Sequence, residues 1–277
     1  MLKRLCLTLM LITTTFAAFA EATQDDMRLE PLISALELRE IFDVMRTEGE
    51  DYGRDLDREL LGGAGGAAWQ DTVSDIYEPG RIWQTFLPRF AAELEGKNIQ
   101  AMTAFFSTKN GRQITALEIS ARRMMLDKAL EQNSREVYRE MAAQDHPRLA
   151  LLKDLIKAND LVEYNVMGAM NASYAFYSGL IDGKAFDHIL SQEDILKDVW
   201  SQEAEIRLDT EEWLYAYLAL AYAPLTDAEL QAYIDFSNTK AGRALNTALF
   251  AGYDDVFSNV SKALGLTAAQ IMRAEPL

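Results

Sequence analysis

Residues 99–112 read IQAMTAFFSTKNGR, and residues 230–243 read LQAYIDFSNTKAGR. Seven of these fourteen positions are identical at an offset of 131 residues, where average residue usage gives roughly one identity. The same offset continues without a gap back to Trp69 and Trp200. Constant spacing over such a stretch indicates an internal duplication. The sequence therefore predicts two copies of one structural unit.

The periodicity of the chain is helical. Apolar residues recur at intervals of three and four, and the 277 residues include only 15 glycines and 6 prolines. We therefore expect an all-α helical bundle built from two internally duplicated copies of about five helices each. The predicted helices cover residues 31–48, 67–78, 80–95, 98–107 and 109–143 in the first copy, and 148–180, 185–207, 210–222, 227–238 and 240–264 in the second.

The first twenty residues are typical of a secretory signal peptide. Lys3 and Arg4 precede an apolar run, and Ala18 and Ala20 supply the small residues that a signal peptidase requires. We expect cleavage after Ala20, because the apolar run is shorter than the roughly 20 residues that span a bilayer. The predicted organisation is a signal peptide over 1–20, a spacer over 21–30, a first repeat over 31–146 and a second repeat over 147–277.

The net charge limits the possible binding partners, and the cysteine content limits how the chain can be stabilised. The net charge is -16, which opposes binding to nucleic acid and to anionic lipid surfaces. Cys6 is the only cysteine and lies in the predicted signal peptide. The mature chain is thus expected to be stabilised without disulfides, to contain no transmembrane helix and to be a monomer that acts as a fused pseudo-dimer.

Two kinds of helix start are visible in the sequence. Thr226 and Glu229 have the spacing of a capping box. Thr108 and Thr239 are expected N-caps, each followed by Lys at the first helical position and by Gly at the third. Because glycine inside a helix costs about 1 kcal/mol relative to alanine, its presence in both copies predicts a close approach of the preceding helix.

This pattern of Phe, a capping Thr, Gly and Arg resembles the bacterial exported family called domain of unknown function 2059. The family often has Pro after the capping residue, whereas this chain has Lys109 and Lys240. The resemblance implies an all-helical protein of the bacterial envelope, located in the periplasm, and implies no catalytic residues. The residues that carry it are Phe105, Thr108, Gly111 and Arg112 in the first copy, and Phe236, Thr239, Gly242 and Arg243 in the second.

Residues with catalytic or metal-binding chemistry are few. His146 and His188 are the only histidines, neither has a counterpart in the other copy, and no metal-ligand spacing such as HExxH is present. The glycine-rich stretch 62–66 is interpreted as a flexible connector. The charges over 209–212 are interpreted as a first helical turn that complements the helix dipole. We therefore predict no catalytic residue, no cofactor and no metal ion, and a protein that is not an enzyme.

The duplicated cations allow two interpretations. Lys109 and Arg112, like Lys240 and Arg243, lie in the first turn of a helix, where free N–H groups already attract anions. Each arginine is expected to bind a carboxylate or a helix-end carbonyl of the neighbouring helix. The alternative is a pair of small anion-binding sites.

Trp69 and Trp200 belong, with the Phe, Thr and Gly positions above, to the residues that both copies share, and we interpret them as structural. Two segments rich in aromatic residues, 164–177 and 213–222, are expected to pack in the core. The predicted function is non-catalytic binding of an unknown envelope protein. The alternative is a periplasmic carrier of a small apolar or anionic ligand in a groove between the repeats. A buried cluster of ionisable groups would instead favour an enzyme.

Overall fold

The computed structural model describes residues 27–185 and 191–274. The predicted signal peptide with Cys6, the start of the spacer and His188 lie outside these residues. The described chain is all-α and contains no strand, and its residues 27–35 are helical. The further helices are α2 (Leu38–Glu59), α3 (Gly66–Ile76), α4 (Pro79–Glu93), α5 (Ile99–Phe106), α6 (Lys109–Met124), α7 (Lys128–Ala143), α8 (Arg148–Ala158), α9 (Leu161–Asp182), α10 (Gln192–Ser201), α11 (Glu203–Tyr222), α12 (Asp227–Ser237) and α13 (Lys240–Ala274).

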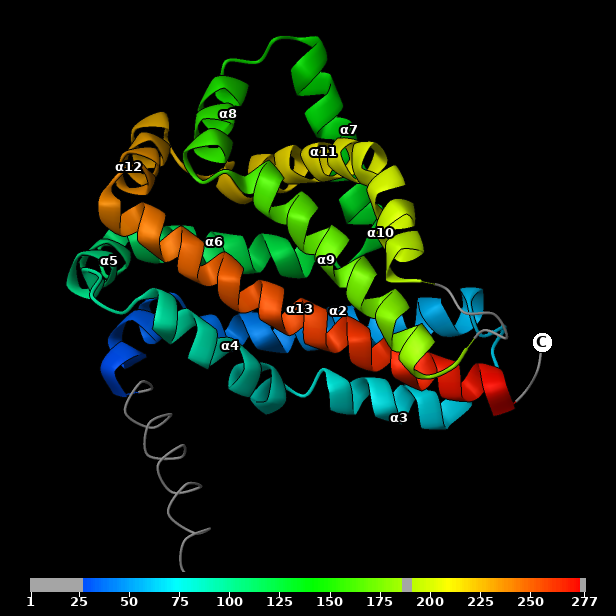
Figure 1. Ribbon diagram of the computed structural model, residues 1–277. Coiled ribbons are helices and arrows are strands. Elements are labelled where there is room, and N and C mark those ends of the chain that lie inside the picture. Colours follow the sequence, from blue (N-terminus) through cyan, green and yellow to red (C-terminus); the bar gives the residue numbers. More distant parts are fainter. Residues whose placement is uncertain (1–26, 186–190, 275–277) are drawn as a thin grey trace, which may run out of the picture.

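The two halves of the chain, before and after residue 147, exchange helices (Figure 1). Helix α13 packs most extensively along α9 of its own half and also along α4 of the first half, while α11 of the second half packs against α6 and α7 of the first. The main core therefore joins residues 29–106 to the apolar side of α13. A second core joins α6 to α8, α11 and α12. Neither core belongs to one half alone.

The repeated stretches meet at the point where the halves cross. The rings of Phe105 and Phe236 stack with their centroids 4.1 Å apart and their planes at 7°. Nearby, Asn110 Nδ2 donates to the backbone carbonyl of Glu229 at 3.0 Å. Phe105 and Phe236 occupy the same position of the repeat, so a residue contacts its own counterpart, as happens on the axis of a twofold symmetric dimer.

The predicted single helix over 109–143 is wrong. The chain turns after Met125, and Asp127 caps a new helix by accepting hydrogen bonds from the backbone N–H groups of Ala129 and Leu130. The corresponding stretch of the second half is unbroken, since α13 continues for 35 residues to Ala274. That helix also runs ten residues beyond the predicted end at 264, and its added turns pack on α9.

The predicted helix over 148–180 is also divided. Asn159 and Asp160 separate α8 from α9, and Asp160 has a left-handed backbone with φ 51°. Glu37 has the same conformation, with φ 49°, at the start of α2, and α2 and α9 both contain 22 residues. The predicted helix over 31–48 therefore also has a break, at residues 36–37. Its second part, α2, continues to Glu59 rather than ending at 48.

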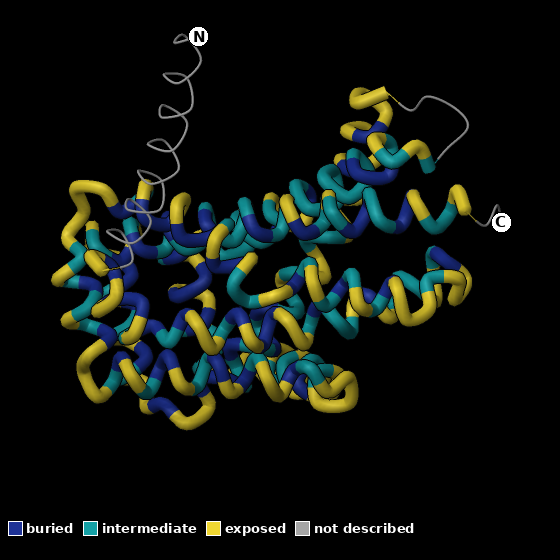
Figure 2. The backbone as a smooth tube through the Cα atoms, turned by 90° about the horizontal axis from the view of Figure 1, so that it is seen from below, coloured by how far each residue is buried: buried dark blue, intermediate teal, exposed yellow. Residues whose placement is uncertain are grey.

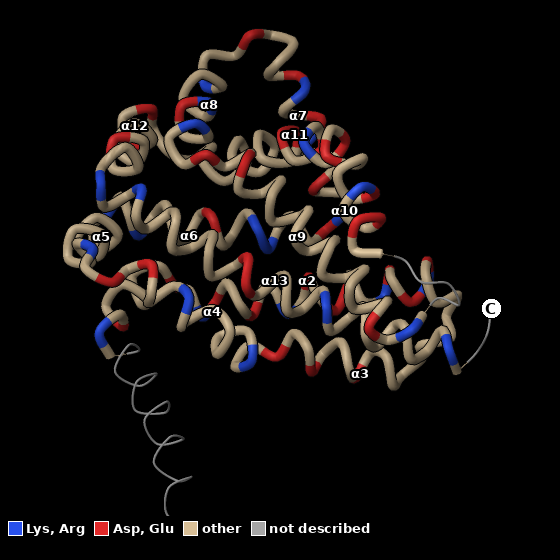
Figure 3. The backbone as a smooth tube through the Cα atoms, viewed as in Figure 1, with Lys and Arg blue, Asp and Glu red and all other residues tan. Residues whose placement is uncertain are grey.

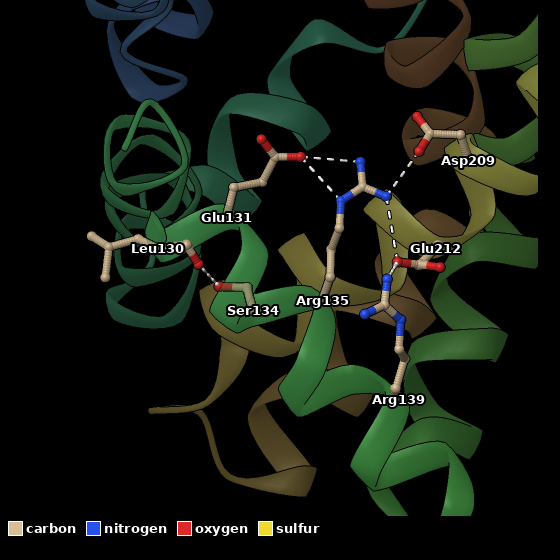
Figure 4. Close-up of polar contacts among 7 residues, drawn as sticks. All are labelled: Leu130, Glu131, Ser134, Arg135, Arg139, Asp209 and Glu212. Atoms are coloured by element: carbon tan, nitrogen blue, oxygen red, sulfur yellow. Dashed lines mark hydrogen bonds and ion pairs between the residues drawn. The ribbon is translucent and has the colours of Figure 1, made fainter. Parts of the chain in front are cut away.

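A polar network attaches α7 to α11 (Figure 4). Arg135 donates to Glu131 at 3.0 Å and to Asp209 at 2.9 Å, and Arg139 donates to Glu212 at 2.6 Å. Helix α11 begins at Glu203, within the stretch 185–207 that was predicted as the preceding helix. Residues 209–212 are thus not a first turn, and the interpretation as dipole-complementing charge is wrong. Two of their carboxylates instead bind arginines of α7.

Burial is uneven along the chain (Figure 2). The largest fully buried side chains, which include Trp69, Phe42, Phe86 and Phe90, come from residues 29–94. Helix α10, which follows the grey segment 186–190, is exposed except at Ile195 and Val199. Helix α10 is therefore attached to α9 and α11 by a small apolar cluster.

Candidate functional site

The repeated stretch forms the same tight turn in both halves. Thr108 Oγ1 accepts from the N–H of Gly111 at 2.9 Å, and Thr239 Oγ1 accepts from Gly242 at 3.0 Å. These contacts confirm both predicted N-caps. A Cβ atom on Gly111 would lie 2.2 Å from the carbonyl oxygen of Phe105. The predicted close approach of the preceding helix is thus confirmed.

The arginines of the repeat also have equivalent partners. Arg112 donates to the carbonyl oxygen of Ser107, and Arg243 donates to that of Asn238, so each closes the end of the preceding helix. Lys109 and Lys240 are exposed at the first helical position. The observed bonds are of the helix-end kind that we expected for the arginines. Anion binding by these four residues stays a prediction.

The two tryptophans of the repeat differ. Trp69 is 1% exposed, and its indole N–H donates to the carbonyl of Gly53 at 2.7 Å. Trp200 is 59% exposed. The interpretation of both as packed structural residues therefore holds for Trp69 and is wrong for Trp200. Sequence identity could not show this, because burial depends on the neighbouring helices.

Trp200 is one of three large apolar side chains that project from α10 and the start of α11. Leu196, one helical turn before it, is 45% exposed, and Leu208 is 70% exposed. We call these three residues the apolar corner, because the two helices meet there at an angle (Figure 1). Leu196 and Trp200 are four residues apart and therefore lie on one face of α10, and neighbouring exposed apolar side chains are typical of a contact with another molecule.

Charged residues flank the apolar corner in the sequence, and most of them are acidic. Asp198 and Glu205 are exposed, and the segment carries further acidic residues at Glu193 and Asp194. Lys197 is paired with Glu193 at 2.8 Å. Elsewhere acidic and basic residues are interspersed over the helices (Figure 3). Residues 193–207 thus carry five carboxylates and two cations, Lys197 and Arg207, and Arg207 is itself bound to Glu163 and Glu203.

A second candidate is a buried cluster of ionisable groups where the halves cross. The hydroxyl of Tyr222 donates to Glu118 Oε1, and Tyr233 also hydrogen-bonds to this carboxyl. The hydroxyl of Tyr217 donates to the backbone carbonyl of Glu118 at 3.0 Å. We call these four residues the tyrosine–carboxylate cluster. Glu118 comes from the first half and the tyrosines from the second.

Burial strongly perturbs this cluster. Loss of hydration raises the pKa of Glu118 to about 7, although the hydroxyls of Tyr222 and Tyr233 act in the opposite direction. One turn along α6, Arg122 forms a two-pronged ion pair with Glu48 of α2, at 2.7 and 2.8 Å. A buried ionisable cluster is the feature that would favour an enzyme, but the groups bonded to the Glu118 carboxyl are hydroxyls of Tyr222 and Tyr233, which pack in the second core, so we interpret the cluster as a contact between the halves. The sequence contained no local sign of this cluster, because its members lie about 100 residues apart.

A third candidate is a groove between α4 and α13. Its volume is about 150 Å³. Ile82, Val256 and Val260 form part of its apolar lining, and Arg81 and Asn259 contribute polar groups. The groove lies between helices of the two halves. It therefore has the location that the carrier hypothesis requires.

Among the described residues, His146 and the acidic residues are the remaining side chains that could bind a metal ion or take part in catalysis. His146 Nδ1 accepts from the backbone N–H of Arg148 at 3.2 Å, so this histidine caps the start of α8. Residues 27–185 and 191–274 contain no group of three or more His, Cys, Asp or Glu that could hold a metal ion. Among the same residues, no helix has the length and apolar content needed to cross a membrane.

Comparisons with protein-family models, with curated proteins and with solved structures found no match for this chain. The resemblance to domain of unknown function 2059 therefore stays a prediction. The three candidate sites are therefore the basis for a proposed function.

Proposed function

We propose that this chain is an exported, non-catalytic binding module of the bacterial envelope, and that it engages a protein partner through the apolar corner. One observation carries the proposal. At the same position of the repeat, Trp69 is buried and hydrogen-bonded, while Trp200 is 59% exposed. Tryptophan is enriched among the residues that dominate binding energy at protein interfaces.

The charge around the corner favours a particular partner. Exposed carboxylates at Asp198 and Glu205 accompany the apolar side chains. A basic rim on the partner would complement them, whereas a second copy of this acidic chain would be repelled. A partner segment with an apolar side and flanking Lys or Arg residues fits best.

The rest of the fold supports a scaffold role. The stacked Phe105 and Phe236 and the exchanged helices are the arrangement expected of a symmetric dimer joined into one chain. Joining the two halves in one chain holds them in a fixed arrangement. It leaves surfaces such as the apolar corner, which the halves do not share, free to carry the binding function.

Replacing Trp200 by alanine is expected to abolish partner capture without lowering stability. The mature protein, immobilised and exposed to envelope extract, should retain a defined partner, and the Trp200→Ala variant should lose it by at least about tenfold, as for a loss above 1.4 kcal/mol. Met27→Ala is the matched control, because Met27 is 71% exposed and does not belong to α10 or α11. Equal capture by wild type and Trp200→Ala would refute the proposal.

The carrier function remains a second candidate because of the α4–α13 groove. Its apolar lining and the guanidinium of Arg81 suit an alkyl chain that ends in a carboxylate. Octanoate is therefore expected to raise the melting temperature of wild type, and to do so less in Arg81→Gln. Calorimetric titration that detects no octanoate binding at millimolar concentration would eliminate this candidate.

A further inference from the structure

The tyrosine–carboxylate cluster joins the two halves through a single carboxyl. Glu118 lies on α6, and its partners Tyr217 and Tyr222 lie on α11 while Tyr233 lies on α12. Helix α6 packs against α11, so these bonds lie within the interface of the exchanged halves. A change in the state of this carboxyl therefore acts directly on that interface.

The cation closest to Glu118 along its own helix is already engaged. Nε and Nη2 of Arg122 donate to the two carboxylate oxygens of Glu48 on α2. Helix α13 contributes Tyr253, whose hydroxyl, like those of the other tyrosines, is neutral at physiological pH because burial raises its pKa to about 12. Among the described residues, no cation is bonded to Glu118. Its ionised form is thus held by hydroxyl groups alone.

We propose that Glu118 is a proton-binding latch between the two halves: the protonated carboxyl fastens α6 to α11 and α12, and ionisation loosens this contact. A neutral carboxyl can donate one hydrogen bond and still accept from Tyr222, and it has little desolvation cost. An ionised carboxyl in the same place carries an uncompensated charge. This inference is independent of the apolar corner and of the proposed binding function.

The direction of the pH effect follows from proton linkage. In the folded protein Glu118 has a pKa of about 7, above the ordinary value of 4.5. Between these two pH values the folded state binds more protons than the unfolded state, so stability falls as pH rises. Carboxyls whose pKa is lowered, such as Glu78 and Glu229, contribute in the opposite sense, but only below about pH 4.5. The carboxyls with a lowered pKa therefore contribute little between pH 5 and 8, the window in which Glu118 acts, and the Glu118→Gln variant identifies its share of the pH effect.

The test is urea unfolding of the mature protein at several pH values from 5 to 8. In wild type the equilibrium constant for unfolding should rise on the order of 10- to 100-fold across this window. Glu118→Gln mimics the neutral carboxyl and should remove most of this rise, so that the variant is more stable than wild type at pH 8. Glu95→Gln is the matched control, because Glu95 is exposed, and it should behave as wild type does.

A second variant keeps the proposal testable if Glu118→Gln folds poorly. Tyr222→Phe removes a hydroxyl that favours the ionised carboxyl, so the loss of stability should extend to higher pH than in wild type. Hydrogen exchange should locate the loosening, with faster exchange at pH 8 in α6, α11 and α12 than in α2 and α3. A wild type with flat stability from pH 5 to 8, or a slope unchanged by both substitutions, would overturn the proposal.

Discussion

Replacing Gly242 by alanine is expected to destabilise the protein, although alanine is the better helix former. A Cβ atom at this position would lie 2.2 Å from the carbonyl oxygen of Phe236 and 2.8 Å from the Cα atom of Ser237. Both atoms belong to the backbone, so relief requires the turn to open. The Thr239 cap and the bond from Arg243 to Asn238 hold that turn closed.

The expected cost is about 1–3 kcal/mol or more, as for other overpacked sites. For a chain of this size that loss corresponds to a decrease in melting temperature of roughly 2–12 °C. The same change at Gly111 should have a similar effect, because its Cβ atom would also lie 2.2 Å from a backbone carbonyl. Thermal unfolding followed by circular dichroism measures both variants.

Gly168 provides the matched control. It lies inside α9, and a Cβ atom there would meet nothing within 4 Å. Gly168→Ala should therefore raise stability by up to about 1 kcal/mol through helix propensity alone. Gly242→Ala and Gly168→Ala should thus change the free energy of unfolding in opposite directions. A Gly242→Ala variant as stable as Gly168→Ala would show that the close approach has no energetic role.

The parts of the fold that sequence could predict are those with local causes. Thr226 and Glu229 form the predicted capping box, with the N–H of Thr226 donating to Glu229 at 2.9 Å. The caps at Thr108 and Thr239 depend likewise on residues three positions away. Such contacts can be inferred from spacing because a helix start fixes the geometry of its own first turn.

The missed features have causes elsewhere in the chain. The break at Asp127 interrupts a pattern that remains helical on both sides, and α7 turns to meet Asp209 and Glu212 of α11. Glu48 and Arg122 are separated by 74 residues. The tyrosine–carboxylate cluster and the α4–α13 groove could not be predicted for the same reason, since each is assembled by helices of both halves. The apolar corner lies within α10 and α11, and it was missed because the exposure of Trp200 depends on how these helices pack.

Trp69→Ala is expected to cost about 3–5 kcal/mol, the usual range for removing a large buried aromatic side chain, whereas Trp200→Ala should change stability by no more than about 0.5 kcal/mol. In the first half, α2 and α3 are in close contact, because a Cβ atom on Gly53 of α2 would lie only 2.6 Å from Cγ1 of Val73 on α3. This close contact places Trp69 of α3 against α2, where its indole N–H bonds to the carbonyl of Gly53.

In the second half, α13 packs closely on α9. A Cβ atom on Gly179 of α9 would lie 2.3 Å from the carbonyl of Lys262, because α13 already covers α9. Helix α10 also packs on α9, through Ile195 and Val199, and Trp200 is exposed on α10. Urea unfolding of the two variants compares the sites directly. If the two substitutions lower the free energy of unfolding by the same amount, Trp200 must be packed in solution. The binding proposal, which rests on the exposure of Trp200, would then be wrong.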